Sequence, residues 1–435
     1  MKRNILSMNK VSVRLRSGWR LTAPLCLAFC LVVLGMAHIA FLAAAAVAGI
    51  FAFYLWRRSK SSALSLATGE KNHLSQINPV DERELARPVI KIGYGLFPLV
   101  ENKKGAPLIG RVDGIRQQLS GQLGFALPHI PIKVDLSLEP NSYRILMGEM
   151  ILAEDLVWPE DALALDDGSV VSAIAGRSCK DPAFGMDALW IDQNEQSRAV
   201  SEGYLVVDAS TVIATHLGSV VRGNAARLFS SDDAQRLIDC LKTSAPQLAD
   251  SLTSGWLSLN AMTAICQELL AENVPLNDFQ KIATAMLEAS SMHGEIVHMV
   301  ETIRQEIGDL IVHAIVPKSL PLTVVTLDAS LESALFKSFK VREGAVYPFD
   351  LLLAQKMIEA VNIAVRSVPV ESRNMTLIAS PVLRRPLSAL LRPRFPDLSI
   401  LSYQELPEDK SIEVLTNIGV PLSSRTMAVT DSNSV

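Results

Sequence analysis

Histidines, the residues most often used as metal ligands and general bases, are few and dispersed in this chain. There are seven in 435 residues, and the closest pair is His293 and His298. Zinc proteases use a His-Glu-x-x-His pattern, which places both imidazole rings on one face of a helix. The wider spacing of His293 and His298 does not do this. The sequence therefore predicts no zinc site, and we expect neither a metal nor a cofactor.

The five cysteines are scattered as well, and no two form a Cys-x-x-Cys pair. An odd number of cysteines argues against a framework of disulfide bonds. We expect reduced, buried thiols at Cys26, Cys30, Cys179, Cys240 and Cys266.

Other catalytic patterns are absent or incomplete. Gly93-x-Gly95 begins like a dinucleotide-binding fingerprint, but Pro98 stands in place of the third glycine. The sequence contains no Gly-x-Ser-x-Gly, Walker loop or kinase motif. The acidic pairs Asp166-Asp167 and Asp232-Asp233 fit solvated or helix-capping roles better than acid–base catalysis. These observations predict a protein that is not an enzyme.

Four arginines gather towards the C-terminal end, at Arg384, Arg385, Arg392 and Arg394. Prolines lie among them, and the aromatic side chains of a nucleic-acid-binding platform are missing. The whole chain has a formal net charge of −4, unlike a basic nucleic-acid-binding protein. We expect this cluster to form a solvated face or a protein contact, and we expect no nucleic acid as a partner.

One stretch combines a stiff turn with an aromatic ring in an unusual place. In Asp181–Gly185, Pro182 fixes φ and Gly185 permits a positive φ, so the chain must bend around Phe184. A core aromatic is rarely placed on such a bend. A strand pattern follows at Gly203–Asp208, and Ser210–Leu217 reads as the capped start of a helix.

An apolar run at residues 21–56 precedes the elements that carry this turn. As one helix it would be about 54 Å long, against roughly 30 Å of bilayer hydrocarbon. Two short spans joined near Gly35–His38 fit better, and basic residues flank both ends, which favours a hairpin with both ends in the cytoplasm. A single long tilted helix is the alternative.

Strand and helix patterns alternate from Pro88 onward, which predicts a mixed α/β or α+β chain. Within it we expect strands at 170–175, 189–191 and 205–207. We expect helices from Ser210 to Phe229, from a cap at Ser231, over 300–311 and over 386–392. The expected division is as follows: a basic segment 1–20, a transmembrane hairpin 21–56, a linker 57–88, a first α/β subdomain 89–158 plus 209–229, an inserted β-rich subdomain 159–208, a helical subdomain 230–316, a last α/β subdomain 317–424, and a loose tail 425–435.

Several short segments, in their order and spacing, resemble the cytoplasmic half of the type III secretion export-gate (FlhA/SctV) family. They are Gly93–Val100, Gly114–Arg116, Asn141–Ile145, Asp181–Ile191, Tyr204–Leu217 and Ser380–Arg384. The resemblance runs from Leu21 to Gly419. It implies a cytoplasmic region of four subdomains below a membrane bundle in the bacterial inner membrane, assembled as a nonameric ring.

The resemblance also implies a site for export chaperones that carry cargo. The corresponding residues here are Asp181 and Phe184 on the turn and Thr215 on the following helix. An exposed ring on a stiff turn suits the docking of a partner helix. The alternative is structural: Phe184 fills the joint between subdomains, Asp181 caps the turn, and Thr215 bonds back into its helix.

The chain departs from the family in two respects. The large membrane part with its Phe-His-Ile-Pro-Glu-Pro motif is not in this sequence, and Gly308-Asp309 stands where the family has Gly-Arg. The expected function is a docking platform of the type III export apparatus, more flagellar than injectisome in pattern. It would bind chaperone–substrate complexes, the export ATPase complex and other export-gate membrane proteins. A truncated remnant or regulatory paralogue, and a membrane-anchored enzyme with an unrecognised site, are the alternatives.

Overall fold

The computed structural model describes residues 87–101, 105–255, 257–291, 295–342, 348–367 and 375–419. They belong to one compact unit of the chain, Pro79–Val435. In these residues the fold is mixed α/β and contains three four-stranded sheets. The expected hairpin at 21–56, nearly all of the linker, and the tail lie outside the described residues. Within the described ranges, no helix has the length and apolar character that a membrane span requires.

The first sheet has the strand order β2-β1-β3-β4. Its strands are β1 (Pro88–Ile92), β2 (Ile132–Val134), β3 (Ser142–Met147) and β4 (Met150–Leu156). β1 pairs parallel to β2 and antiparallel to β3. The alternating burial of β1, with Ile90 and Ile92 inside, gives the sheet one core face. A short 3₁₀ helix, η1 (Tyr94–Leu99), follows β1.

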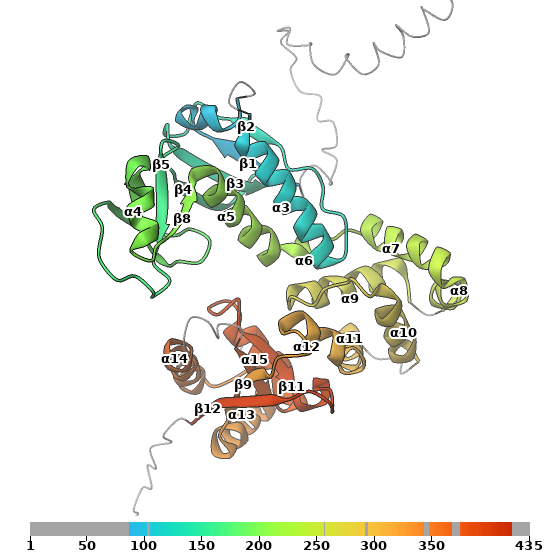
Figure 1. The fold of residues 1–435 in the computed structure, drawn as a ribbon. Coiled ribbons are helices and arrows are strands. Elements are labelled where there is room, and N and C mark those ends of the chain that lie inside the picture. Colours follow the sequence, from blue (N-terminus) through green and yellow to red (C-terminus); the bar gives the residue numbers. More distant parts are fainter. Residues whose placement is uncertain are drawn as a thin grey trace, which may run out of the picture. The chain divides into compact units, whose positions relative to one another are not determined.

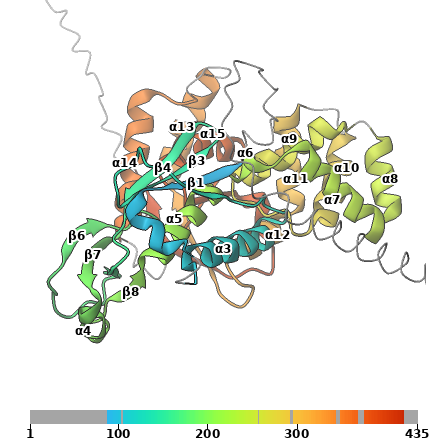
Figure 2. The same ribbon diagram turned by 90° about the horizontal axis from the view of Figure 1, so that it is seen from above.

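Two helices pack together on this unit: α3 (Pro107–Leu123) and α5 (Ala209–Gly223) lie side by side (Figures 1 and 2). Gly218 of α5 faces Ile115 of α3 at close range. α3 ends at Gly124, whose φ of 82° is the left-handed conformation that glycine commonly supplies at the end of a helix. The expected helix from Ser210 to Phe229 is instead two helices, because α5 stops at Asn224 and α6 (Ala225–Leu228) follows.

The second sheet, of order β6-β7-β5-β8, is antiparallel throughout. Its strands are β5 (Asp161–Leu165), β6 (Arg177–Lys180), β7 (Asp187–Asp192) and β8 (Leu205–Asp208), with η3 (Gln193–Glu195) and α4 (Gln196–Ser201) between β7 and β8. The expected strand at 170–175 is wrong: that segment has no regular structure. Its Val171 is exposed, and the segment contacts the small core of this sheet through the buried Ile174 and the partly buried Val170. β8 runs directly into α5, which returns the chain to the first unit.

The next part of the chain is helical. It comprises α7 (Ser231–Ser244), α8 (Pro246–Ser254), α9 (Leu259–Ala271), α10 (Phe279–Ser290), α11 (Ile296–Glu306) and α12 (Gly308–Ile315). Ser230 caps α7, not Ser231 as expected, and forms a reciprocal capping box with Asp233. The single helix expected over 300–311 is divided between α11 and α12 at Ile307.

The last unit is a parallel sheet of order β11-β10-β9-β12. Its elements are β9 (Leu322–Leu327), α13 (Ala329–Val341), α14 (Leu351–Ser367), β10 (Thr376–Ala379), α15 (Pro381–Leu391), β11 (Ser399–Ser402), η5 (Tyr403–Glu405) and β12 (Ile412–Ile418). α15 begins before the expected Pro386, which lies inside the helix. The subdomain boundaries expected from the sequence stay a prediction.

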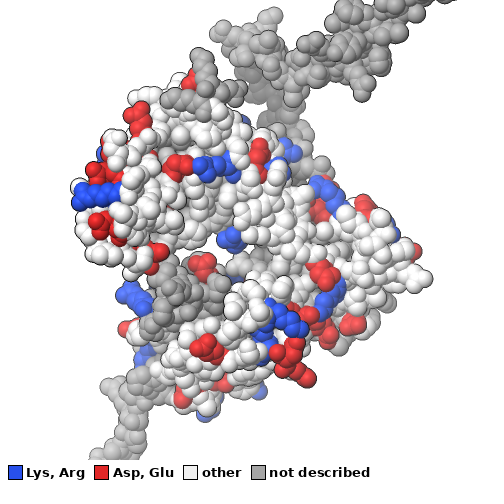
Figure 3. Space-filling view, in the orientation of Figure 1, with Lys and Arg blue, Asp and Glu red and all other residues white. Residues whose placement is uncertain are grey.

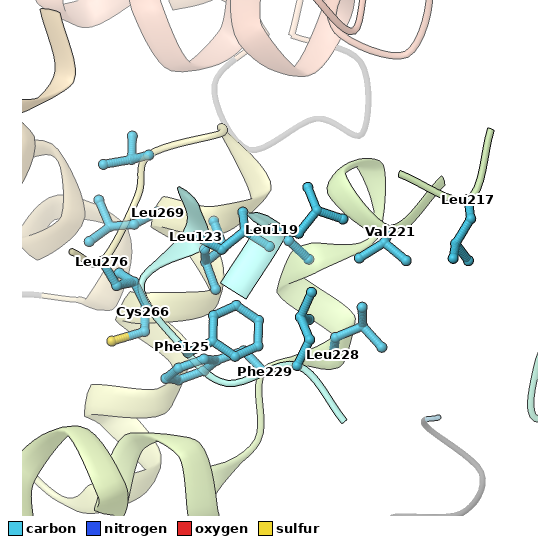
Figure 4. Close-up of a cluster of buried hydrophobic side chains, with 14 of the residues drawn as sticks. Leu119, Leu123, Phe125, Leu217, Val221, Leu228, Phe229, Cys266, Leu269 and Leu276 are labelled. Carbon is cyan, nitrogen blue, oxygen red and sulfur yellow. The ribbon is translucent and has the colours of Figure 1, made fainter. Parts of the chain in front are cut away.

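A continuous apolar core connects the first unit to the helical part (Figure 4). Phe125 and Phe229 meet edge to face, with ring centroids 5.2 Å apart. Leu119 and Leu123 of α3, and Cys266 and Leu269 of α9, lie around them. Aromatic pairs of this geometry contribute beyond their buried area.

The helical part meets the last unit through buried charges. Arg384 of α15 pairs with Glu272 and Glu301. Arg304 lies 2.9 Å from Glu272 and 2.6 Å from Glu405. Both arginine side chains are almost completely buried. This joint, which we call the buried ion network, consists of Glu272, Glu301, Arg304, Arg384 and Glu405.

Candidate functional site

The turn between β6 and β7 is held by its own backbone and by one carboxylate. The backbone N–H of Asp181 donates to Met186 O, and that of Gly185 donates to Asp181 O, both at 2.8 Å. Oδ2 of Asp181 accepts from the backbone N–H of Ala183 at 3.1 Å and of Phe184 at 2.7 Å. Gly185 has a φ of 69°, which a glycine adopts without strain. The turn is therefore rigid, as the proline and glycine spacing indicates.

Phe184 is 58% exposed, whereas Asp181 is buried. The ring does not fill a joint between subdomains, so that alternative is wrong for Phe184. For Asp181 the structural alternative is correct, because its carboxylate caps the turn. An exposed ring on a braced turn costs little conformational entropy when a partner covers it.

Asp208 caps α5, not Ser210 as the sequence analysis expected. Its Oδ1 accepts from the backbone N–H of Thr211 at 2.9 Å and from the Ser210 hydroxyl at 2.5 Å. Arg111 of α3 pairs with the same carboxylate. Burial favours the neutral form of Asp208, but these hydrogen bonds and the Arg111 charge outweigh it and lower the pKa.

Thr215 lies on α5, half-buried, one turn after Thr211. Its hydroxyl donates to Thr211 O at 2.8 Å, so it bonds back into its own helix, as the structural alternative holds. The Oγ1 of Thr215 retains acceptor capacity in this geometry.

A buried histidine lies next to Thr215 and was missed by the sequence analysis. The ring nitrogen Nδ1 of His216 lies 2.6 Å from the hydroxyl oxygen of Tyr143, a residue of β3 that is completely buried. Burial lowers the pKa of His216, while the charges of Asp155 and Asp181 oppose that shift. Burial raises the pKa of Tyr143 and of Asp181. The charge of Asp181 on the turn therefore acts on His216 of α5.

Phe184 and the second half of α5 line one cleft of about 660 Å³. Ser219, Arg222 and Gly223 come from α5, and Thr215 lies one helical turn before Ser219. Neither Asp181 nor Thr215 lines the cleft itself. Of the three candidate residues, Phe184 lines the cleft, and Asp181 is buried within the turn that carries the ring. Thr215 lies on α5, the helix that also supplies Ser219 and Arg222 to the cleft.

The acidic residues considered for catalysis, where the structure describes their contacts, have structural roles. Asp166 and Asp167 accept backbone hydrogen bonds from Gly168 and Ser169. Asp233 belongs to the capping box of α7. His298 is exposed on α11, and His293 lies outside the described residues. In the described part of the chain, no group of three or more histidine, cysteine, aspartate or glutamate residues is arranged to hold a metal ion.

Two expectations about side-chain exposure are wrong. Arg384 is not on a solvated face, because it is completely buried in the ion network. Cys240 is exposed, while Cys266 is buried and Cys179 half-buried. Cys240 lies on the outer face of the amphipathic helix α7, where its small side chain needs no apolar partner. Charged residues of both signs are scattered over the face seen in Figure 3, without a continuous field of one sign.

A comparison of the sequence with known families gives one match that covers most of the chain. Residues 13–411 match the FHIPEP family. The chain belongs to the FHIPEP family.

Two relatives of this chain carry flagellar names. The chain is 31% identical over 391 residues to "Flagellar biosynthesis protein FlhA" of Proteus mirabilis, covering 88% of this chain and 56% of that protein. It is 30% identical over 403 residues to "Putative truncated flagellar export/assembly protein LfhA" of Escherichia coli K12, covering 88% of this chain and 68% of that protein. The chain spans about half the length of the first of these relatives.

Solved structures share the fold. The structure of the Chlamydia pneumoniae CdsV and CdsO protein complex contains a chain with a TM-score of 0.67 and 18% identity, covering 80% of this chain and 99% of that chain. The nonameric EPEC SctV-C structure gives a TM-score of 0.62 and 16% identity, covering 79% of this chain and 100% of that chain. At these identities the likeness concerns the fold alone. The mixed α/β fold is thus confirmed, and so is the family expected from the motifs.

Proposed function

We propose that this FHIPEP-family chain acts in the type III protein export apparatus of the flagellum as a docking platform for export substrates and their chaperones. The family match and the flagellar names of its relatives support the export apparatus. The single observation that supports the docking role is the exposure of Phe184: the braced turn leaves its side chain 58% exposed beside a cleft. A rigid exposed aromatic is the type of residue that dominates binding energy at protein interfaces.

In this proposal Asp181 and Thr215 act with Phe184, but in different ways. Asp181 holds the turn through two backbone hydrogen bonds and positions the ring. Thr215 lies on the same helix as the cleft residues Ser219 and Arg222, one and two turns earlier. A partner helix that covers Phe184 and extends along α5 would reach Thr215 as well.

The proposal includes an assembly and further partners. A nonameric ring, tethered to the bacterial inner membrane by the hairpin at 21–56, would present nine copies of the site and multiply weak contacts by avidity. The nonameric SctV-C structure supports such a ring by its fold. The export ATPase complex and other export-gate membrane proteins are the remaining proposed partners. The chain would act by binding and handover, and not as an enzyme.

The test is a pull-down of purified flagellar chaperone–cargo complexes with the full chain. Phe184→Ala should reduce recovery of the chaperone at least about tenfold, as expected for loss of a central aromatic contact. Phe97→Ala is the matched control, because Phe97 is 48% exposed and lies close to a proline in the sequence, as Phe184 does, but belongs to η1. Equal recovery by wild type and Phe184→Ala would remove the docking role.

A second candidate is a paralogue that binds partners or joins rings of a longer relative without supporting export. The similarity to a relative named as putatively truncated favours it. The two candidates separate in a strain that lacks its full-length export gate. Restored flagellar secretion on stable expression of this chain supports a working gate component, and binding without secretion supports the paralogue.

A further inference from the structure

The cleft beside Phe184 has a composition that favours one kind of partner. Its lining residues include apolar ones, namely Phe184, two prolines and three alanines, and six others that carry a charge. The charged residues are Arg222, Glu268, Glu272, Arg385, Arg392 and Asp397. Which of these charges is already neutralised decides what the cleft can attract.

Both glutamates of the cleft are engaged. Glu268 lies 3.2 Å from Arg385. Glu272 pairs with Arg304 and Arg384 of the buried ion network and accepts a hydrogen bond from Ser388 at 3.0 Å. These carboxylates are therefore poorly available to a ligand.

Of the three arginines that line the cleft, Arg222 and Arg392 make no ion pair with a carboxylate of the described residues. Arg222 is exposed at the end of α5 and donates only to the amide oxygen of Gln122, at 3.2 Å. Arg392 follows α15 and is half-buried, and no ion pair holds it. Burial lowers the pKa of Arg392, the charge of Glu272 opposes this, and the charges of Arg304 and Arg384 add to it. Asp397, the third acid of the lining, makes no ion pair with any residue that the structure describes.

We propose that this cleft binds an acidic segment of a partner polypeptide, with carboxylates on Arg222 and Arg392 and an apolar side chain against Phe184. This inference rests on the docking role proposed above and adds the chemistry of what docks. Arginine suits the task because its planar guanidinium can hold a carboxylate through two hydrogen bonds. The apolar contact supplies affinity, and the two charges supply selectivity for acidic over neutral segments.

The probes are two labelled synthetic peptides and a purified flagellar chaperone–cargo complex, with binding to the full chain followed by fluorescence anisotropy. In one peptide glutamates alternate with leucines, and in the other glutamines replace the glutamates. The wild type should bind the glutamate peptide more tightly. Arg222→Gln and Arg392→Gln should each weaken that binding about two- to fivefold, as for partly exposed charge pairs, and leave the glutamine peptide unaffected.

Two further variants near the cleft sharpen the test, one as a control and one with the opposite expected effect. Arg394→Gln removes an arginine two residues further on, which is exposed and does not line this cleft, so binding should not change. Asp397→Asn removes the unpaired acid and should strengthen binding of the glutamate peptide. Raising the salt concentration should erase these differences, because the Debye length falls to about 3 Å at 1 M.

The outcomes separate this inference from the docking role. If Phe184→Ala abolishes binding of the chaperone–cargo complex while the arginine variants bind the two peptides as the wild type does, the docking role stands and the acidic segment is wrong. Equal affinity of the wild type for both peptides also overturns the acidic segment. Unchanged binding of the complex by Phe184→Ala overturns the docking role itself.

Discussion

The Phe184 turn and the buried ion network both satisfy poorly exposed carboxylates, but with different partners and to opposite effect. At the turn, one buried carboxylate is satisfied by backbone N–H groups, and the ring beside it stays in water. In the network, carboxylates and guanidinium groups satisfy each other, and the joint between two parts of the chain is closed. The first arrangement leaves an exposed ring for another molecule to cover, and the second uses its charged side chains to close a joint within the chain. Stability and binding should therefore respond to different substitutions.

The largest effect is expected in the buried ion network. Arg384→Ala removes the arginine that pairs with Glu301 and one of the two that pair with Glu272, and removing one member of a buried pair costs about 3–5 kcal/mol. Arg385→Ala, its neighbour, breaks only a partly exposed pair with Glu268 and should cost less than about 1 kcal/mol. Urea unfolding of both variants measures the difference. Similar losses would show that the network is no more important than a surface ion pair.

The second effect concerns the backbone beside the network. A Cβ on Gly308 would lie 2.2 Å from the carbonyl oxygen of Glu405, so Gly308→Ala must displace η5 and should cost about 1–3 kcal/mol. Gly110→Ala is the control, since a Cβ there meets no atom within 4 Å. Inside α3 that change should stabilise the chain by about 0.5–1 kcal/mol. Thermal unfolding of the two variants should move in opposite directions.

The turn should show a smaller loss of stability and a separate loss of binding. Asp181→Ala removes the acceptor of two backbone N–H groups and should cost about 0.5–2 kcal/mol, as for a lost cap. Phe184→Ala should change stability by less than about 0.5 kcal/mol, because the ring is mostly in water. Chemical denaturation compares them. A loss of stability in Phe184→Ala as large as in Asp181→Ala would mean that the ring is part of the fold.

The smallest effect is a pH dependence at His216. Its pKa is lowered on folding from 6.5, so the folded chain binds fewer protons than the unfolded chain near that pH. The contribution of neutral His216 to the free energy of unfolding is therefore complete above about pH 6.5. It is lost as the pH falls from there through the lowered pKa of the folded state. His216→Gln should lose less stability than the wild type between pH 7.5 and 5.5. A steeper loss in the variant would contradict the assignment.

Local chemistry made much of the turn and the helices predictable. Proline and glycine spacing predicts the bend at Phe184, and Gly124 predicts the end of α3. Cap positions were less certain, because Asp208, Ser210 and Thr211 are all good caps and only the fold decides that Asp208 serves α5.

Other elements could not be predicted because their evidence is not local. β12 was missed since most of its residues are exposed, so it lacks the alternating pattern of a half-buried strand. Tyr143 and His216 lie 73 residues apart and meet only when β3 packs under α5. The motif around Thr215 contains His216, but nothing in the sequence indicates that its ring is buried and hydrogen-bonded. Residue contacts at the cleft likewise come from four separate segments.

Site-specific photocrosslinking in living cells tests the docking surface most directly. A benzoylphenylalanine at position 184 should form a covalent adduct that mass spectrometry identifies as a flagellar export chaperone or its cargo, and the same probe at position 97 should not. An adduct with these proteins at position 97 and none at position 184 would contradict a docking surface centred on Phe184.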